Sequence, residues 1–351
     1  AAYVAAEQAT LSINQGLFDI SVTVGSDGGG TPLVHNGTTT GPASTGSGDR
    51  QGIFMVAVPK NTAITMLIAP NGQLGFDVAG GATVENGAIY LQAGGNLSVN
   101  PNETIVNRIV DLPASTPGAS IQIDSGSFTS PIAAQASKDL LITAGMAPGI
   151  SLAGESYFYG ANLVHLVANT NGVFTADKSV VLNAFGAVPG IVQIDAVAGS
   201  TMNFADLELR ADTLSGRFFT NAADPSKGGT AALRATGGAI TVNGDLTVSA
   251  IGSSPAAVST FGGNADISVN GGTITAKADT LVDVSASTSG ASLEGTGGQA
   301  NVFANAGGSL SFTNLLSLRA TGAGTNGASG AGGTASVVTG PAGGSIAAAT
   351  I

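Results

Sequence analysis

Gly262-Gly263-Asn264-Ala265-Asp266-Ile267-Ser268-Val269-Asn270-Gly271-Gly272 is one copy of a repeat that decides the fold of this chain. The opening glycine pair returns every 34 to 35 residues, and a second pair follows nine to eleven residues after each first one. Self-similarity at such a period is typical of a solenoid, a propeller or an array. The opening pairs are Gly228-Gly229, Gly262-Gly263, Gly297-Gly298 and Gly332-Gly333, and the second pairs are Gly237-Gly238, Gly271-Gly272, Gly307-Gly308 and Gly343-Gly344.

The apolar residues of each unit fall into three sets, and each set predicts one short strand. Alternation of apolar and polar residues with period two indicates a strand that buries one face. The first set is Ala231, Leu233 and Ala235, then Ala265, Ile267 and Val269, then Ala300, Val302 and Ala304, then Ala335, Val337 and Thr339. The second is Ile240, Ile274, Leu310 and Ile346, and the third is Leu246-x-Val248-x-Ala250, Val282-x-Val284-x-Ala286 and Leu316-x-Leu318-x-Ala320.

The third signature also occurs earlier in the chain, which extends the predicted solenoid back to about residue 50. Its closing alanines are Ala93, Ala144, Ala168, Ala184, Ala211, Ala250, Ala286 and Ala320. The 51 residues between Ala93 and Ala144 suggest two coils. The 16 residues between Ala168 and Ala184 are too few for a coil of three strands, so we expect one of these two matches to be misplaced.

Stacked coils explain this pattern better than hairpins or propeller blades. Asn-Gly, the strongest hairpin signal, occurs at seven places but never at one fixed position of the repeat. The chain contains no Trp, and the columns keep the same chain direction from unit to unit. We therefore predict an all-β parallel β-helix of nine to eleven coils with Gly-rich loops between them. A β-propeller is the structural alternative.

Composition and charge restrict the possible partners. Charged residues make up only 9% of the 351 residues, and the net charge is −11. An acidic chain does not suit nucleic acid, which binds clustered Lys and Arg, or an anionic membrane surface. Because there is no Cys, disulfides and thiolate metal sites are excluded. The sequence has no apolar run long enough for a membrane span.

The sequence predicts three regions. Residues 1–50 hold a strand at Phe18–Val24, followed by a Gly-, Ser- and Thr-rich loop over Gly25–Asp49. Residues 51–227 are expected to form shorter, irregular coils, in which the apolar runs 52–58 and 63–69 have both faces covered, by the 1–50 segment or by an insertion at Glu103–Pro117. Residues 228–351 hold the Gly-Gly repeats, and the last unit stops in mid-repeat, so we expect the chain to be part of a longer protein.

Residues 49–67 and 86–94 carry a resemblance to a known family. The runs Asp49-Arg50-Gln51-Gly52-Ile53-Phe54-Met55-Val56-Ala57-Val58-Pro59-Lys60-Asn61-Thr62-Ala63-Ile64-Thr65-Met66-Leu67 and Asn86-Gly87-Ala88-Ile89-Tyr90-Leu91-Gln92-Ala93-Gly94 resemble the large exoproteins of alphaproteobacteria. These are grouped with filamentous haemagglutinin and other two-partner-secreted adhesins. The resemblance implies a right-handed parallel β-helix at the cell surface with an adhesive or fibre-forming role. The family's N-terminal secretion domain is not recognisable here.

The sequence predicts no catalytic, cofactor-binding or metal-ligating residue. His35 and His165 are far apart, and alternation places His165 on an outer face as an exposed, unpaired side chain. Gly262-Gly263-Asn264-Ala265-Asp266 departs from the Gly-rich calcium repeat, because Ala265 and Ile267 stand where Gly and Asp are required. Asp245 and Asp283 are expected to stack near one another on the outer side of the third strand, as solvent contacts.

These observations predict an extracellular structural or adhesive fibre at a bacterial surface that mediates attachment, cell–cell contact or formation of a biofilm matrix. Its expected partners are its own copies or its own chain continuation in a filament, and surface glycans or other cells. It is not expected to be an enzyme. The alternative is a carbohydrate-active β-helix enzyme, a polysaccharide lyase or hydrolase, which needs three or more acidic or basic side chains along a cleft on adjacent coils.

Overall fold

The computed structural model is all-β, with long parallel strand ladders consistent with a β-solenoid. It describes residues 1–45, 50–70, 72–77, 87–103, 117–184, 189–213, 227–253 and 258–351. The chain divides into two compact units, residues 1–160 with 174–180 and residues 161–173 with 181–351. Parallel ladders favour the solenoid over the propeller, because propeller blades belong to the antiparallel architectures.

Unit 1 contains three parallel ladders, and each of four coils contributes one strand to each of them; the second ladder also takes in a strand of the following coil, and the third begins with the N-terminal strand. The first ladder holds β3 (Gly30–His35), β6 (Ile64–Ile68), β9 (Ala119–Asp124) and β12 (Asp139–Ala144). The second holds β4 (Thr38–Gly41), β7 (Gln73–Phe76), β10 (Gly126–Phe128), β13 (Ile150–Leu152) and β16 (Val173–Ala176). The third holds β1 (Ala2–Asn14), β5 (Gly52–Ala57), β8 (Ala88–Ala93), β11 (Ile132–Ala136) and β14 (Ser156–Gly160).

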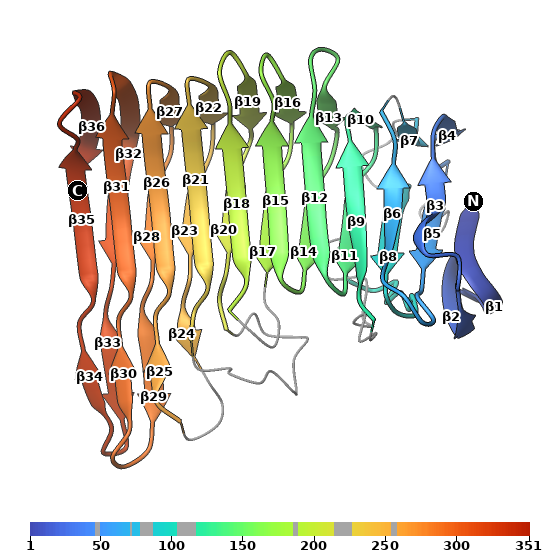
Figure 1. Ribbon diagram of the computed structural model, residues 1–351, viewed down its shortest axis with the longest axis horizontal. Coiled ribbons are helices and arrows are strands. Elements are labelled where there is room, and N and C mark those ends of the chain that lie inside the picture. Colours follow the sequence, from blue (N-terminus) through green and yellow to red (C-terminus); the bar gives the residue numbers. More distant parts are fainter. Residues whose placement is uncertain are drawn as a thin grey trace. The chain divides into compact units, whose positions relative to one another are not determined.

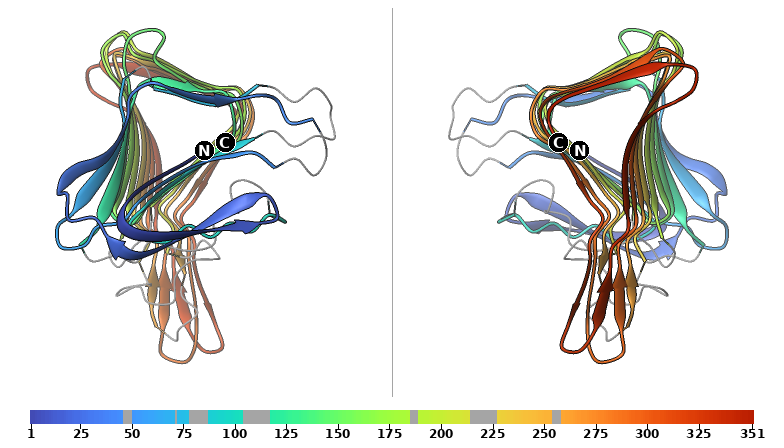
Figure 2. Two further views of the ribbon diagram at one scale, coloured as in Figure 1. Left: turned by 90° about the vertical axis from the view of Figure 1, so that its right-hand side faces the viewer. Right: turned by 90° about the vertical axis from the view of Figure 1, so that its left-hand side faces the viewer.

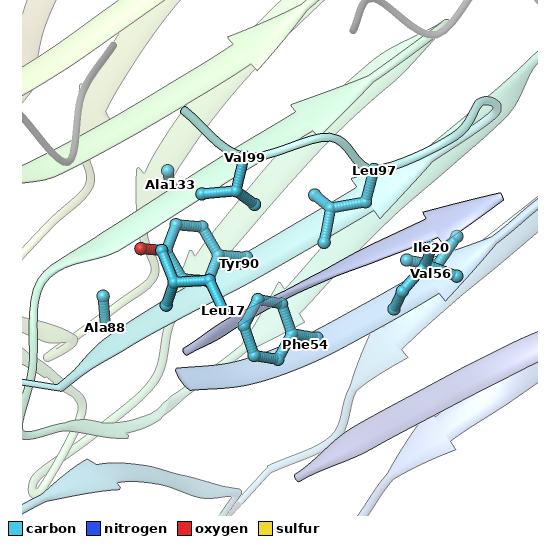
Figure 3. Packing of buried hydrophobic residues seen from close by; sticks show 9 residues of the cluster. All are labelled: Leu17, Ile20, Phe54, Val56, Ala88, Tyr90, Leu97, Val99 and Ala133. Atoms are coloured by element: carbon cyan, nitrogen blue, oxygen red, sulfur yellow. The ribbon is translucent and has the colours of Figure 1, made fainter. Parts of the chain in front are cut away.

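The second strand of an N-terminal hairpin covers the outer side of the third ladder in unit 1. Strand β1 turns into β2 (Leu17–Gly25) and pairs with it antiparallel, which confirms the predicted strand at Phe18–Val24. Leu17 and Ile20 pack against Phe54 and Tyr90, whose rings stack with centroids 5.1 Å apart (Figure 3). Residues 53–57 of β5 are buried on both faces, as predicted, and the 1–50 segment supplies the cover together with Leu97 and Val99. For the second run, 63–69, the prediction is wrong, because β6 is fully buried only at alternate residues.

The predicted loop over Gly25–Asp49 is wrong at residues 30–35 and 38–41, which are strands. Strands β3 and β4 lie inside it and pair in parallel with β6 and β7, so the solenoid begins before residue 50. The sequence signal is weak because Thr38, Thr39 and Thr40 contribute no aliphatic alternation. Of this segment, residues 46–49 lie outside the described part of the chain, as does most of the predicted insertion at Glu103–Pro117.

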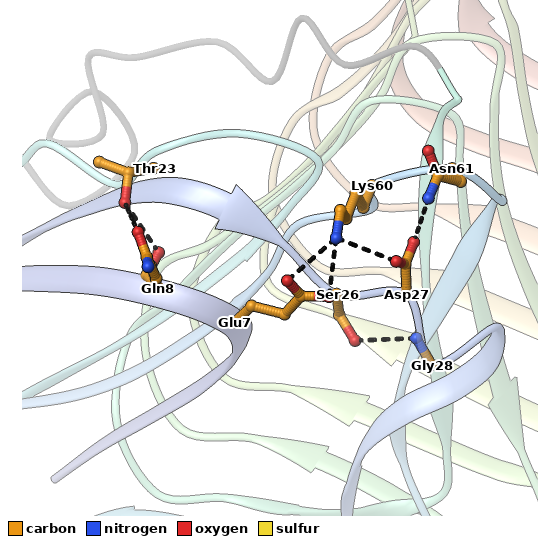
Figure 4. A network of polar contacts seen from close by, with 8 residues as sticks. All are labelled: Glu7, Gln8, Thr23, Ser26, Asp27, Gly28, Lys60 and Asn61. Atoms are coloured by element: carbon orange, nitrogen blue, oxygen red, sulfur yellow. Dashed lines mark hydrogen bonds and ion pairs between the residues drawn. The ribbon is translucent and has the colours of Figure 1, made fainter.

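A polar network joins the hairpin to the first coil of unit 1 (Figure 4). The Lys60 ammonium lies 3.0 Å from a carboxylate oxygen of Glu7 and 3.0 Å from one of Asp27. Hydrogen bonds from Lys60 to Glu7 and to Asp27 raise the pKa of the lysine. Because all three side chains are solvent-exposed, the network fixes the local conformation more than it stabilises the fold.

Unit 2 is also built of three parallel ladders (Figure 1). From residue 228 onward, each Gly-Gly repeat contributes one strand to the first ladder. The first ladder holds β15 (Leu163–Ala168), β18 (Ile191–Ala196), β21 (Thr230–Thr236), β26 (Asn264–Asn270), β31 (Gln299–Asn305) and β35 (Thr334–Thr339). The second holds β19 (Thr201–Phe204), β22 (Ala239–Val242), β27 (Thr273–Ala276), the first half of β32 (Gly308–Arg319) and β36 (Gly344–Thr350). The third holds β20 (Leu207–Arg210), β23 (Leu246–Ser249), β28 (Thr280–Asp283) and the second half of β32, while β17 (Val180–Ala184) lies at the boundary between the units.

The predicted columns of the first two strands are confirmed. Leu233 pairs with Ile267, Ile267 with Val302 and Val302 with Val337, so these side chains form one aliphatic ladder. The first three are buried, and Val337, in the last row, is 37% exposed. The second column pairs in the predicted order, Ile240, Ile274, Leu310 and Ile346. The described first ladders hold four strands in unit 1 and six in unit 2, a total within the predicted nine to eleven coils.

The prediction that every match to the third signature is a third strand of a coil, in one register, is wrong in two respects. The matches ending at Ala144 and Ala168 lie on the first ladder, in β12 and β15, which accounts for the short gap before Ala184. In the second Gly-Gly unit the register is shifted by two residues, since Leu246 pairs with Thr280 and not with Val282. Apolar alternation that ends in Ala occurs on two faces of the coil, so it cannot by itself identify the face.

Each of the last coils of unit 2 also sends out a two-stranded excursion, and together these form a lateral extension. The Gly-rich segments predicted as loops form part of it. One three-stranded parallel sheet holds β24 (Gly252–Ser253), β29 (Ala286–Ser289) and β33 (Gly322–Thr325), and the other holds β25 (Thr260–Phe261), β30 (Glu294–Thr296) and β34 (Ser329–Ala331). Figure 2 shows the extension projecting from the coils. An added Cβ at Gly322 would lie 2.0 Å from the Ala331 oxygen, so the two sheets approach closely because their residues are small.

Candidate functional site

The opening Gly-Gly pairs bring neighbouring coils of unit 2 into backbone contact. A Cβ added to Gly263 would lie 2.1 Å from the Gly229 oxygen, and one added to Gly298 would lie 2.0 Å from the Gly263 oxygen. At the same corner the Gly263 N–H donates to the Ala250 carbonyl, where the third strand of the preceding coil ends. The pair is therefore the point at which the chain returns from the lateral extension and enters the next coil, and at Gly263 and Gly298 only glycine fits.

A groove follows this row of glycine pairs in unit 2. Its volume is about 750 Å³, and it is lined by the glycine pairs, by the residue that follows each pair, and by Phe261 and Thr296 at the returning ends of the extension. Lys227 is the charged residue in this lining, together with Pro189. The residues that follow the glycines are Thr230, Asn264, Gln299 and Thr334, and they pair with one another in register across four coils. We call this feature the glycine groove.

The outer face of the first ladder in unit 2 continues from the groove as a hydrogen-bonded polar surface. Asp266 accepts hydrogen bonds from the amide groups of Asn264 at 2.6 Å and of Asn301 at 2.9 Å. The Ser336 hydroxyl donates to the Asn301 side-chain oxygen at 2.7 Å. These bonds cross from β26 to β31 and β35, so they hold the outer side chains in a fixed pattern from coil to coil.

His165 has a partner, contrary to the prediction of an unpaired side chain. Its Nε2 lies 2.7 Å from Oδ2 of Asp195, which also accepts a hydrogen bond from Gln193. Burial alone would raise the pKa of Asp195, but the hydrogen bonds from His165 and Gln193 outweigh burial, and the pKa is lowered. The pairing of β15 with β18 brings the two residues together from positions 30 apart in sequence. The pair therefore joins β15 to β18 on the outer face of the first ladder.

The expected stacking of Asp245 on Asp283 is wrong, because the register shift separates them. Asp245 belongs instead to a row of carboxylates at the corner before the third strand, with Asp206 and Asp279 in neighbouring coils. Asp206 accepts the Asp245 N–H at 3.0 Å, and Asp245 accepts the Asp279 N–H at 3.3 Å. Asp279 accepts the Asn314 amide at 2.6 Å. These carboxylates are engaged in joining one coil to the next.

Asp283 lies instead in a buried polar cluster with Asp212, which the sequence reading missed. Both are 9% exposed. Asp212 accepts the Ile251 N–H at 2.7 Å and the Ser249 hydroxyl at 3.0 Å, and Ser249 pairs with Asp283 in the third ladder. Burial raises the pKa of Asp212 to about 6, against the lowering effect of these two hydrogen bonds. Its sequence signal is an Asp directly after the closing Ala211 of the signature.

In unit 1, His35 lies in a small cluster with two hydroxyl groups. Its Nε2 is 3.0 Å from the Thr39 hydroxyl, which is 2.8 Å from the Tyr3 hydroxyl. The Tyr3 and His35 rings meet edge to face, with centroids 6.1 Å apart. Burial lowers the pKa of His35. These contacts connect the hairpin strand β1 to the first coil.

Among the described residues, no group of three or more His, Cys, Asp or Glu side chains could hold a metal ion. Within the same residues, no helix is long and apolar enough to cross a membrane.

Comparisons with protein-family models, with curated proteins and with solved structures find no significant match. The class of protein is therefore defined by the fold alone, as an all-β chain with the parallel ladders of a β-solenoid.

Proposed function

We propose that this chain is a structural and adhesive β-solenoid of a bacterial cell surface, similar in kind to filamentous haemagglutinin, with right-handed coils and Gly-rich loops between them. The observation that carries the proposal is the unbroken register of the first ladder in unit 2. Its inner column is aliphatic and is buried in every coil but the last, while its outer columns carry mostly polar side chains, interrupted by Ala232, Phe303 and Val338. A long, regular stack of this kind provides a stiff support for repeated weak contacts.

The distribution of carboxylates supports a binding role over the alternative of a carbohydrate-active enzyme. General acid–base cleavage of a glycosidic bond requires two carboxyl groups facing the substrate. The glycine groove offers amides, hydroxyls and one ammonium group instead. The row of Asp206, Asp245 and Asp279 spans adjacent coils, as the alternative requires, but its oxygens accept hydrogen bonds from the next coil.

The proposal is tested on cells that produce the native protein. Immunogold electron microscopy with antibodies against unit 2 should label thin fibres at the cell surface, and deletion of the gene should reduce attachment of the cells to a solid surface. A matched strain in which the gene is restored is the control. Label confined to the cell interior, or attachment unchanged by the deletion, would contradict the proposal.

A further inference from the structure

The glycine groove has the length of a polymer-binding site. Its lining comes from four successive coils, from Gly228 to Thr334. Neighbouring parallel strands lie about 4.8 Å apart, so three intervals between coils extend over roughly 14 Å. Thr230, Asn264, Gln299 and Thr334 are placed at this interval by the register of the ladder. A ligand that lies along the groove therefore meets one polar side chain per coil.

The groups that can form hydrogen bonds with a ligand in the groove are side chains, because the N–H groups of its glycine pairs are already paired within the fold. The N–H groups of the glycine pairs donate within the fold, as from Gly229 to Ala211, from Gly263 to Ala250 and from Gly298 to Val284. A peptide that adds a strand to a sheet edge needs such groups to be free. Hydroxyl and amide side chains, by contrast, both donate and accept, which matches a ligand rich in hydroxyl groups.

One aromatic residue and the single charged residue in the lining indicate which class of ligand the groove suits. Phe261 lines the groove and is 41% exposed, so part of this aromatic residue is accessible to a ligand in the groove. An exposed aromatic ring next to amides is a usual combination for a ligand with both apolar and polar faces. Lys227 is the one ionised side chain in the lining. Lys227 is exposed and remains in solvent beside a neutral ligand, whereas the repeated charges of an acidic glycan would meet only this one cation in the lining.

We propose that the glycine groove binds a linear, neutral glycan that runs across the coils. One sugar ring stacks on Phe261, and the sugar hydroxyl groups bind the polar side chains that follow the glycine pairs, among them Gln299. Gln299 is exposed, and no hydrogen bond joins its side-chain amide group to another described residue, although its backbone N–H donates to the Gly263 carbonyl. This inference rests on the proposed adhesive function and names its ligand and its site.

The test uses the purified 351-residue chain on an array of neutral and acidic oligosaccharides, followed by titration calorimetry with the hexasaccharide that binds best. The expected result is binding to neutral linear glycans that persists at high salt, since it involves no ion pair. Phe261→Ala and Gln299→Ala should each weaken binding about tenfold or more, the effect of losing one stacking or hydrogen-bonding contact.

Phe303→Ala is the matched control, because Phe303 is a comparably exposed phenylalanine (37%) on the outer face of β31, away from the groove lining. It should leave binding unchanged. Circular dichroism shows that each variant is folded, and Gln299→Ala replaces an exposed side chain that the fold does not need. The inference is overturned if no neutral glycan binds, if acidic glycans bind better and are released by salt, or if all three variants behave alike. Surface fibres that persist in these outcomes leave the proposed function intact.

Discussion

The buried carboxyl of Asp212 gives unit 2 a pH-dependent stability that one substitution should remove. Asp212 is 9% exposed and accepts hydrogen bonds from the Ile251 N–H and the Ser249 hydroxyl. Burial raises its pKa to about 6. In Asp212→Asn the amide oxygen still accepts the Ile251 N–H, and the Ser249 hydroxyl can accept a hydrogen bond from the new NH₂ group. The substitution therefore removes the charge and preserves the packing.

The sign of the effect follows from the raised pKa. A carboxyl in the unfolded chain has a pKa of about 3.9, so the folded state holds the proton more tightly. The contribution to stability is fully present below pH ~4 and is lost as the pH rises to about 6. A difference of roughly two pKa units at about 1.36 kcal/mol each amounts to about 3 kcal/mol. Asp212→Asn should thus be more stable than wild type at pH 7 by up to about 3 kcal/mol, and little different at pH 4.

Urea unfolding at pH 4, 5, 6 and 7, followed by circular dichroism, measures this difference. Asp195→Asn is the control with the opposite sign. Because hydrogen bonds from His165 and Gln193 lower the pKa of Asp195, its carboxylate stabilises the fold above the ordinary pKa, and this contribution disappears as the pH falls. Asp195→Asn should therefore be least stable relative to wild type at pH 7. An Asp212→Asn difference that stays constant from pH 4 to pH 7 would refute the reasoning.

Two further predictions concern the repeat itself. Gly263→Ala places a Cβ 2.1 Å from the Gly229 oxygen and should destabilise unit 2 by about 2 kcal/mol or more. At Gly332 the atom nearest to an added Cβ is 4.0 Å away, so Gly332→Ala should be tolerated. Thermal unfolding compares the two variants, and equal melting temperatures would contradict the close stacking of the coils. Thr280→Val replaces a buried hydroxyl that has no hydrogen-bond partner, so it should raise the free energy of unfolding by about 1 kcal/mol. The midpoint of urea unfolding measures this change. A lower midpoint would count against the register in which Thr280 pairs with Leu246.

The candidate site was only partly accessible from the sequence. The glycine pairs and the polar residue after each of them are visible in the repeat, as in Gly263-Asn264 and Gly298-Gln299. That they line a groove together with Phe261 depends on where the lateral extension returns to the coil. The pairing of His165 with Asp195 was missed because the repeat is irregular before residue 228, and the two strands could not be aligned from their spacing.

The sequence by itself determined the strands of the repeat, their inner faces and the parallel stacking. The reason is local, since alternation with period two and a fixed repeat length place Leu233, Ile267 and Val302 in one column whatever the loops do. Only the tertiary structure decided which ladder a strand joins, that Thr280 takes a core position, and that Asp212 is buried. These depend on the unequal lengths of the excursions between coils, and a shift of two residues keeps the same face inward while changing every neighbour.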